Sequence, residues 1–463
     1  MTGTPSGNAT GTIQCRRNPF LFDQVMRSLP TTAPIAVHLG SGIFFTLGYH
    51  EGLSGGGQIL NNMRIVGEGI DVTTVTVVAV TAQSQNAYAM GHDLVSPSGT
   101  APNSRDFVEI RDLTLNLDGS GVFPAPTVID SLSPVGGVRL MGNHTRVVRV
   151  KLRMWNNQNS ALIGYGISLI TANTNALNSL ANVAGVSNCG IEECIAIEAN
   201  TPNTLRFVLF HVGGKEIPGV TPGLGKGCYI RNCFVDGTDF QTNQDFGQLT
   251  QGLSMAWCTG GVVEGNQVLN CLFGGPYMEE GSGNTANRGA YGITVRGNTY
   301  RNVALGLAWQ LGSVGAPNAG VKKLLIEDNT FELATGANIA TINVGGLAAG
   351  VYAMILDDKA AATAPYQSVI IRGNRIRYLD GAASGSGNGV RVLGATNLQV
   401  GENILENMPS NPLKNLRCGS VSYFENKTPA GVLIRGFNEF STNLYTELET
   451  DAEEALVIGF MQS

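Results

Sequence analysis

The sequence predicts an all-β chain folded as a right-handed parallel β-helix, a solenoid of stacked coils with a short N-terminal capping helix. Three observations support this prediction. The 463 residues include 61 glycines and only 14% charged side chains, against roughly a quarter in ordinary globular domains. Few windows show the periodicity of an amphipathic helix. A short strand-and-bend pattern also recurs along the chain, and such internal repeats are typical of solenoids.

Five copies of this pattern align on an asparagine. In VIIRGNRIRY, residues 369–378, an apolar run ends at Gly-Asn and an alternating run follows. A period of two places the apolar side chains on one face of a strand. The five asparagines are Asn266, Asn298, Asn329, Asn374 and Asn403, at steps of 32, 31, 45 and 29 residues.

A second strand precedes most copies. It opens with a glycine and continues with alternating apolar residues, as in GLSMAWC from Gly252 and GVYAMIL from Gly350. Degenerate forms of the same pair of strands begin at residues 137, 166 and 206. One such unit cannot bury its apolar face alone, whereas stacked copies can. A leucine-rich horseshoe is the main rival, but its Leu-x-x-Leu-x-Leu pattern is missing, and the Asn-Gly hairpins of a propeller are missing too.

Each aligned asparagine is expected at a bend between strands. Asparagine tolerates unusual backbone angles, and its side-chain amide both donates and accepts hydrogen bonds. We therefore expect the asparagines to bond to one another from coil to coil, as part of the scaffold rather than of a functional site.

Two earlier units carry cysteine at the asparagine position and again five residues before it. Stacking in register would place Cys189 over Cys228 and Cys194 over Cys233, about 4.8 Å apart, within the range of a disulfide. One alternative is one or two disulfides between coils. The favoured alternative is an inward stack of thiols that pack as small apolar residues.

The two ends of a solenoid must be capped. Residues 1–17 are expected to be a flexible segment, and residues 18–440 a single β-helix domain. A capping helix is predicted at about residues 20–29, where Phe22, Val25, Met26 and Leu29 share one face and Pro30 ends the helix. Residues 441–463 are predicted to form a C-terminal cap or a docking segment.

Charge and hydropathy exclude some classes of protein. The net charge is −6 and the basic residues form no cluster of the kind that binds a nucleic-acid backbone, so no nucleic-acid partner is expected. No apolar run is long enough for a membrane span. The first residues do not resemble a signal peptide.

The sequence resembles the pectin-lyase-like right-handed β-helix superfamily over residues 18–440. The resemblance rests on the helix followed by IAVHLGSGIFF, on GEGIDVTTV, and on the repeated rungs that end in asparagine. It implies a polysaccharide partner and an extracellular or cell-surface location. It implies no single activity, because the superfamily contains lyases, hydrolases, epimerases, tailspikes and non-catalytic adhesins. The Gly-His-Gly signature of polygalacturonases and the Arg-x-Pro-x-x-Arg run of pectate lyases are missing.

Candidate site residues lie on long glycine-rich loops, where solenoids place function. Paired carboxylates suit glycoside hydrolysis, whereas a lyase needs a base and cations that neutralise a uronate. Tyrosines on the same loops could stack against sugars. The catalytic candidates are Glu279, Glu280, Asp357, Asp358, Asp236 and Asp239, and the substrate-binding candidates are Lys215, Arg288, Tyr277 and Tyr291. No metal site and no cofactor are indicated.

Two hypotheses about function remain. The first is a carbohydrate-active protein, a lyase or glycoside hydrolase, that binds and cleaves an extended polysaccharide in a lateral groove. The second is a non-catalytic structural or adhesive protein that self-assembles as a homo-oligomer. Two carboxylates about 5 to 9 Å apart in one groove would favour the enzyme.

Overall fold

The computed structural model of the chain divides into two compact units, unit 1 at residues 1–238 and unit 2 at residues 239–463. Each unit is described by itself. The residues that the structure describes are 19–31, 34–46, 48–50, 57–77, 87–92, 103–117, 135–153, 163–170, 186–197, 206–214, 225–237, 249–256, 258–271, 273–279, 292–311, 323–333, 343–344, 347–348, 352–358, 366–379, 389–393, 395–408, 412–416, 418–434 and 437–439.

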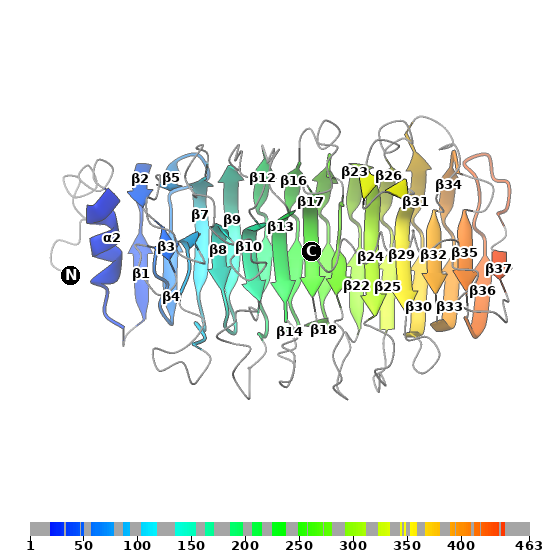
Figure 1. Cartoon of the computed structure of the whole chain (residues 1–463), viewed down its shortest axis with the longest axis horizontal. Helices are drawn as coiled ribbons and strands as arrows, with labels where there is room; N and C mark the ends of the chain where they lie inside the picture. Colours follow the sequence, from blue (N-terminus) through cyan, green and yellow to red (C-terminus); the bar gives the residue numbers. More distant parts are fainter. Residues whose placement is uncertain are drawn as a thin grey trace. The chain divides into compact units, whose positions relative to one another are not determined.

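Unit 1 is a stack of coils whose strands pair in parallel from coil to coil (Figure 1). Its first sheet contains the strands that carry the bends: β1 (Ile35–His38), β2 (Gly42–Thr46), β4 (Met63–Val66), β5 (Thr73–Val77), β7 (Glu109–Asn116), β9 (Arg146–Arg153), β11 (Gly190–Glu192), β12 (Ile195–Ile197), β15 (Tyr229–Arg231) and β16 (Phe234–Asp236). Its second sheet contains β3 (Tyr49–His50), β6 (Ala87–Met90), β8 (Val135–Leu140), β10 (Ile163–Ile170) and β13 (Arg206–Gly213), with β3 antiparallel to β6. A two-residue strand, β14 (Gly225–Lys226), follows β13.

Unit 2 repeats this arrangement. Its first sheet contains β19 (Val262–Glu264), β20 (Gln267–Leu269), β22 (Ile293–Arg296), β23 (Thr299–Val303), β25 (Lys323–Glu327), β26 (Thr330–Leu333), β30 (Tyr366–Arg372), β31 (Arg375–Tyr378), β33 (Ala395–Gly401), β34 (Ile404–Glu406) and β36 (Ser420–Phe424). Its second sheet contains β17 (Leu249–Ala256), β21 (Tyr277–Glu279), β24 (Leu305–Leu311), β29 (Tyr352–Asp358), β32 (Val390–Leu393), β35 (Leu413–Leu416) and β37 (Phe437–Glu439). The short strands β18 (Cys258–Thr259), β27 (Asn343–Val344) and β28 (Leu347–Ala348) lie outside these two sheets.

The predicted asparagine column is confirmed. In unit 2 each ladder asparagine is at most 1% exposed and donates its side-chain amide to the carbonyl oxygen of the next asparagine side chain, at 2.9 to 3.0 Å. A sixth member, Asn426, extends the column beyond the five that the repeat predicts. The preceding residue has a positive φ in every case, which turns the chain between the two strands: Gly265, Gly297, Asp328, Gly373, Glu402 and Glu425.

The core follows from the period-two pattern. In β25 and β26, for example, Leu324, Ile326, Phe331 and Leu333 are at most 2% exposed, whereas Lys323 points to solvent. Identical positions in successive coils therefore stack, and the apolar faces of all strands in a unit meet in its interior.

The predicted N-terminal capping helix is α2 (Pro19–Arg27). Phe22 and Met26 are buried, and the Phe22 ring lies 6.0 Å from that of Phe44 in β2. Asp23 is also fully buried and accepts a 2.7 Å hydrogen bond from the Thr46 hydroxyl. This helix covers apolar surface next to the first coil, as the amphipathic pattern predicts. No described helix has the length and apolar character needed to cross a membrane.

The cysteine pairs stack as predicted, and the favoured thiol alternative is confirmed. The register Gly190↔Tyr229 makes Cys189 and Cys228 neighbours, and all four cysteines of the two pairs are buried thiols rather than disulfides. The Cys228 thiol and burial raise the pKa of the Cys189 thiol, which stays protonated.

Candidate functional site

Most of the predicted site residues lie where the structure gives no description of their side chains. Lys215, Asp239, Glu280, Arg288 and Tyr291 fall outside the described residues. Only the backbone is described for Tyr277 and Glu279 in β21, and for Asp357 and Asp358 in β29. Asp236 ends β16 in unit 1 and is half-buried.

The strand register relates two of the predicted carboxylates. Glu279 pairs with Gln310 of β24, and Gln310 pairs with Asp357 of β29. The two acidic residues therefore occupy one row of the second sheet in unit 2 with a single strand between them. Two strand spacings correspond to a Cα separation of about 9.6 Å.

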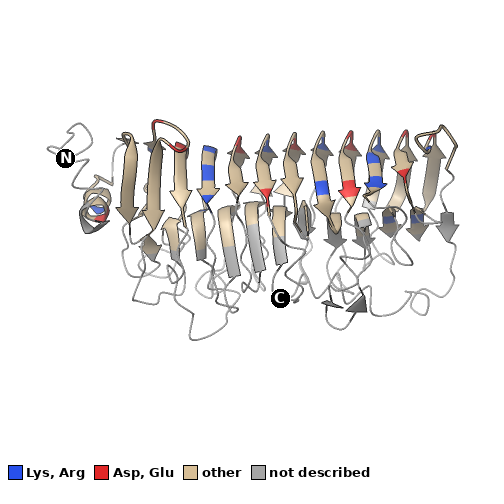
Figure 2. Ribbon diagram, turned by 90° about the horizontal axis from the view of Figure 1, so that it is seen from above, with Lys and Arg blue, Asp and Glu red and all other residues tan. Residues whose placement is uncertain are grey.

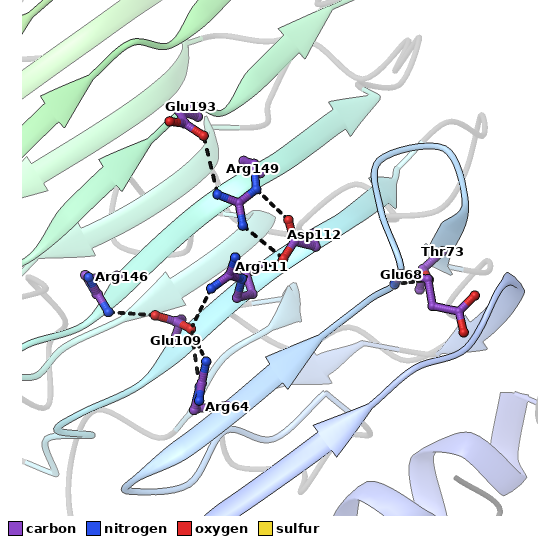
Figure 3. A network of polar contacts seen from close by, with 9 residues as sticks. All are labelled: Arg64, Glu68, Thr73, Glu109, Arg111, Asp112, Arg146, Arg149 and Glu193. Carbon is purple, nitrogen blue, oxygen red and sulfur yellow. Dashed lines mark hydrogen bonds and ion pairs between the residues drawn. The ribbon is translucent and has the colours of Figure 1, made fainter. Parts of the chain in front are cut away.

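Described residues of unit 1 line a concave site, on a surface that the loop-based prediction missed. It is a concavity of about 590 Å³ on the first sheet, between the starts of successive strands. Figure 3 shows three charged residues of its lining, with Glu109 between Arg64 and Arg146. The lining residues are Arg64, Phe107, Val108, Glu109, His144, Arg146, Asn188 and Tyr229.

Two neighbouring positions of each coil supply most of this lining. One row consists of strand residues in register across β4, β7, β9, β11 and β15. The other row lies two residues earlier, at the turn that enters each strand. The strand row is Arg64, Glu109, Arg146, Gly190 and Tyr229, and the turn row is Asn62, Phe107, His144, Asn188 and Gly227.

The turn row adopts the left-handed backbone region throughout. The φ angle is 54° at Asn62, 52° at Asn188 and 59° at Gly227, and asparagine and glycine are the residues that tolerate this region. The same angle is 56° at Phe107 and 55° at His144. Histidine is enriched in this region, whereas a bulky residue such as Phe107 is an outlier there and costs about 1–2 kcal/mol.

Phe107 and His144 present an aromatic surface to solvent. The Phe107 and His144 rings stack with their centroids 4.9 Å apart and their planes 6° apart. Phe107 is 58% exposed, although phenylalanine is usually buried. Because Phe107 and His144 lie on consecutive coils, their stacked rings form one aromatic surface beside the concavity, here named the aromatic shelf.

Tyr229 supplies a third ring, at the opposite end of the concavity from Phe107. A Cβ atom on Gly190 would lie only 2.0 Å from this ring, so the tyrosine rests flat on the glycine of the preceding coil. The Arg231 guanidinium lies 4.4 Å from the ring centroid on a neighbouring position, within the range of a cation–π contact. Glycine at position 190 therefore determines where this aromatic face lies.

Glu109 is the electrostatic centre of the site. Arg64 and Arg146 approach its two carboxylate oxygens at 2.9 and 2.7 Å, and Arg111 lies 3.6 Å away. Burial raises the pKa of the Glu109 carboxyl, but the hydrogen bond from Arg64 and the charges of the three arginines outweigh burial and hold this pKa below its usual range. Glu109 is therefore ionised at neutral pH and orients both flanking guanidinium groups.

A second polar network continues along the same strands. Asp112 binds Arg149 at 2.6 Å, and Arg149 reaches Glu193 on the next coil at 3.4 Å (Figure 3). Acidic and basic side chains recur in this way along one layer of strands (Figure 2). Within the described ranges, no group of three or more His, Cys, Asp or Glu side chains is placed to hold a metal ion.

Comparisons with known proteins give only distant matches. No family model matches the sequence, and no curated protein matches it. A surface adhesin of Streptococcus pneumoniae, PfbA, aligns over 91% of this chain and 90% of its own, with 9% identity and a TM-score of 0.46. DFA-IIIase from Arthrobacter chlorophenolicus, solved with DFA-III, aligns over 91% and 94%, with 11% identity and a TM-score of 0.48. The Dettilon tailspike protein aligns over 87% and 64%, with 10% identity and a TM-score of 0.47.

The predicted parallel β-helix is confirmed by the strands of each unit, which pair in parallel from coil to coil. The solved structures above are distant matches with TM-scores below 0.5, so they identify no activity for this chain.

Proposed function

We propose that the protein binds an extended polysaccharide in the concavity of unit 1. The observation that carries the proposal is the pair of rings at Phe107 and His144, exposed and stacked at turn positions where neighbouring coils have asparagine or glycine. The fold would be more relaxed with asparagine at position 107. The exposed Phe107 ring is therefore better explained by a ligand than by the scaffold.

The lining provides the groups that a sugar chain requires. The ring face of Phe107 offers a flat apolar surface, and Tyr229, whose ring packs against Gly190 and the Arg231 guanidinium, offers its polar hydroxyl. Asn188, Arg64 and Arg146 offer hydrogen-bonding groups between and beside the rings. The volume of about 590 Å³ lies within the usual range of ligand sites, about 300–1,000 Å³.

The decisive variant is Phe107→Asn. Asparagine already occupies the same turn position in two other coils, so the fold should tolerate it. Binding to a panel of neutral and acidic polysaccharides would be measured by isothermal titration calorimetry for the wild type, Phe107→Asn and Phe107→Tyr. We expect Phe107→Asn to weaken binding about tenfold, equivalent to about 1.4 kcal/mol, and Phe107→Tyr to bind within threefold of the wild type. Equal binding by the asparagine variant, with an unchanged circular dichroism spectrum, would exclude this site.

A second candidate function is cleavage of a polysaccharide at a site in unit 2. The row Glu279–Gln310–Asp357 supports it, because Cα atoms about 9.6 Å apart allow the two carboxyl groups to approach the separation of about 6.5–9.5 Å found in inverting glycosidases. Glu279 and Asp357 would act as the acid and the base, with Tyr277 and Arg288 as binding residues. The remaining predicted candidates, Glu280, Asp358, Asp236, Asp239, Lys215 and Tyr291, stay predictions.

Cleavage is tested by product analysis. The protein would be incubated with the same polysaccharides while new reducing ends and unsaturated products are followed. Reducing ends that disappear in Glu279→Gln and Asp357→Asn but persist in Asp358→Asn would support hydrolysis by this row. Binding without any product would leave the non-catalytic, adhesive function.

A further inference from the structure

We propose that the concavity selects anionic glycans and that Arg64 and Arg146 bind the sugar carboxylate or sulfate group. The inference rests on the proposed binding function and adds the chemical class of the ligand. Three observations support it: the balance of charge around Glu109, the exposure of the positive charges to solvent, and the position of the aromatic shelf.

The charges around Glu109 are unbalanced. Arg64 and Arg146 both bind this one carboxylate, whereas Arg111, 3.6 Å away, binds Asp112 at 2.6 Å. The group of Arg64, Glu109 and Arg146 therefore carries one surplus positive charge in a chain whose net charge is −6. In unit 2, Glu327 binds Arg372 at 2.7 Å, and Glu332 binds two arginines, Arg301 and Arg377.

The positive charges of this cluster face solvent, and the negative charge does not. The side chains of Arg64 and Arg146 are 57% and 49% exposed, whereas that of Glu109 is 10% exposed. Both arginines line the concavity. An approaching ligand would therefore meet two guanidinium groups, with the carboxylate held beneath them.

The same carboxylate positions both cations. Arg64 donates from Nε and Nη2 to Oε1, and Arg146 donates from Nη2 to Oε2. A guanidinium group has five N–H donors, so each arginine retains donors that these bonds do not use. An arginine held in one orientation loses less rotamer freedom when it binds a second anion, and its planar fork matches a carboxylate or a sulfate.

The aromatic shelf lies beside these cations. Phe107 and His144 precede Glu109 and Arg146 by two residues on the same coils, so a sugar ring on the shelf would bring its substituents toward the arginine pair. In unit 2, Arg301 and Arg377 flank the carboxylate of Glu332 as Arg64 and Arg146 flank that of Glu109, but no concavity is described at these residues. This group therefore serves as a comparison for the one in unit 1.

The test uses the full chain and five probes: polygalacturonate, its fully methyl-esterified form, dextran sulfate, unmodified dextran, and single-stranded DNA as a polyanion that is not a glycan. Affinities would be measured by titration calorimetry at low and high sodium chloride. We expect each anionic polymer to bind at least about tenfold more tightly than its uncharged partner, and the difference to shrink at high salt because exposed charges are screened. Preference for polygalacturonate would identify a sugar carboxylate as the ligand group, and preference for dextran sulfate would identify a sulfate; either result supports the proposal.

Variants locate the effect. The double variant Arg64→Gln/Arg146→Gln should lose about tenfold in affinity for the anionic polymer and none for the neutral one. Arg146→Lys keeps the charge and should retain part of the affinity, and Arg301→Gln in unit 2 should match the wild type. Equal affinity for charged and uncharged partners would overturn the inference but leave the binding function intact. Binding of no polysaccharide would overturn both, and equal binding of single-stranded DNA would show a general polyanion site and overturn the inference.

Discussion

Replacing one ladder asparagine by alanine should destabilise unit 2 severely. The Asn329 side chain donates to Val295 O, Glu327 O and Asn374 Oδ1, each at 3.0 Å. It accepts from the backbone and side-chain N–H groups of Asn298, at 3.0 and 2.9 Å. Asn329→Ala removes all five hydrogen bonds from a residue that is 1% exposed.

The size of the stability loss depends on which buried groups lose their hydrogen-bond partners. Each net hydrogen bond contributes about 0.5–1.5 kcal/mol, and a buried donor left without a partner costs about 1–3 kcal/mol. The Asn298 backbone N–H is such a donor, whereas its side-chain amide retains Val263 O at 2.9 Å. We therefore expect Asn329→Ala to lower the free energy of unfolding by about 3–5 kcal/mol.

The assay is urea unfolding followed by circular dichroism, together with native-state hydrogen exchange. Asn397→Ala is the matched control, because Asn397 is exposed in the same sheet and makes one bond, to Gln367 O at 3.2 Å. The control should remain within about 0.5–1 kcal/mol of the wild type. In Asn329→Ala the Asn298 amide should also lose exchange protection. A loss of stability below about 1 kcal/mol, with that amide still protected, would refute the scaffold role of the ladder.

Three further predictions concern unit 1. The pKa of Glu109 is lower in the folded than in the unfolded protein, so Glu109 contributes stability above its unfolded pKa of about 4.3, and this contribution is lost as the pH falls through the lower folded pKa. Glu109→Gln should therefore flatten the fall of the melting temperature between about pH 5 and 3. An unchanged slope would contradict this prediction. Gly190→Ala should displace the Tyr229 ring, which lies 2.0 Å from the added Cβ, and weaken glycan binding several-fold with little change in melting temperature; unaltered affinity would remove Tyr229 from the site. In a Cys15→Ser variant, a thiol reagent should label none of the seven remaining cysteines, all of them buried thiols, before unfolding and all seven after it. Fast labelling of the native protein would show that Cys189 and its neighbours are accessible.

The scaffold could be predicted because its pattern is local. A run of alternating apolar residues followed by Gly-Asn specifies a strand, a bend and an inward amide within ten residues, and the repeat then implies stacking. Asn426 was missed because its segment, SVSYFENK, alternates apolar with polar residues but lacks the long aliphatic run of the other copies. The structure shows its strand β36 to be largely exposed.

The concavity could not be predicted in the same way. Arg64, Glu109 and Arg146 are 45 and 37 residues apart, and only the coil lengths bring them together. Phe107 would be assigned to the core by its residue type, whereas the structure places it at a left-handed turn in solvent. A signal was present in the segments NNMR, DFVE and NHTR, where a turn residue precedes a charged residue by two positions. The alignment on asparagine did not include these earlier coils.

The asparagine column also gives unit 2 an electrical direction. Each side-chain amide from Asn266 to Asn403 donates to the ladder asparagine of the next coil. Each from Asn298 onward also accepts from the ladder asparagine of the preceding coil, so the amide dipoles point the same way. Head-to-tail amides polarise one another, as peptide groups do along a helix. The interior of the unit therefore has a positive pole toward Asn426 and a negative pole toward Asn266. A coil inserted within this column without asparagine would divide one long dipole into two shorter ones.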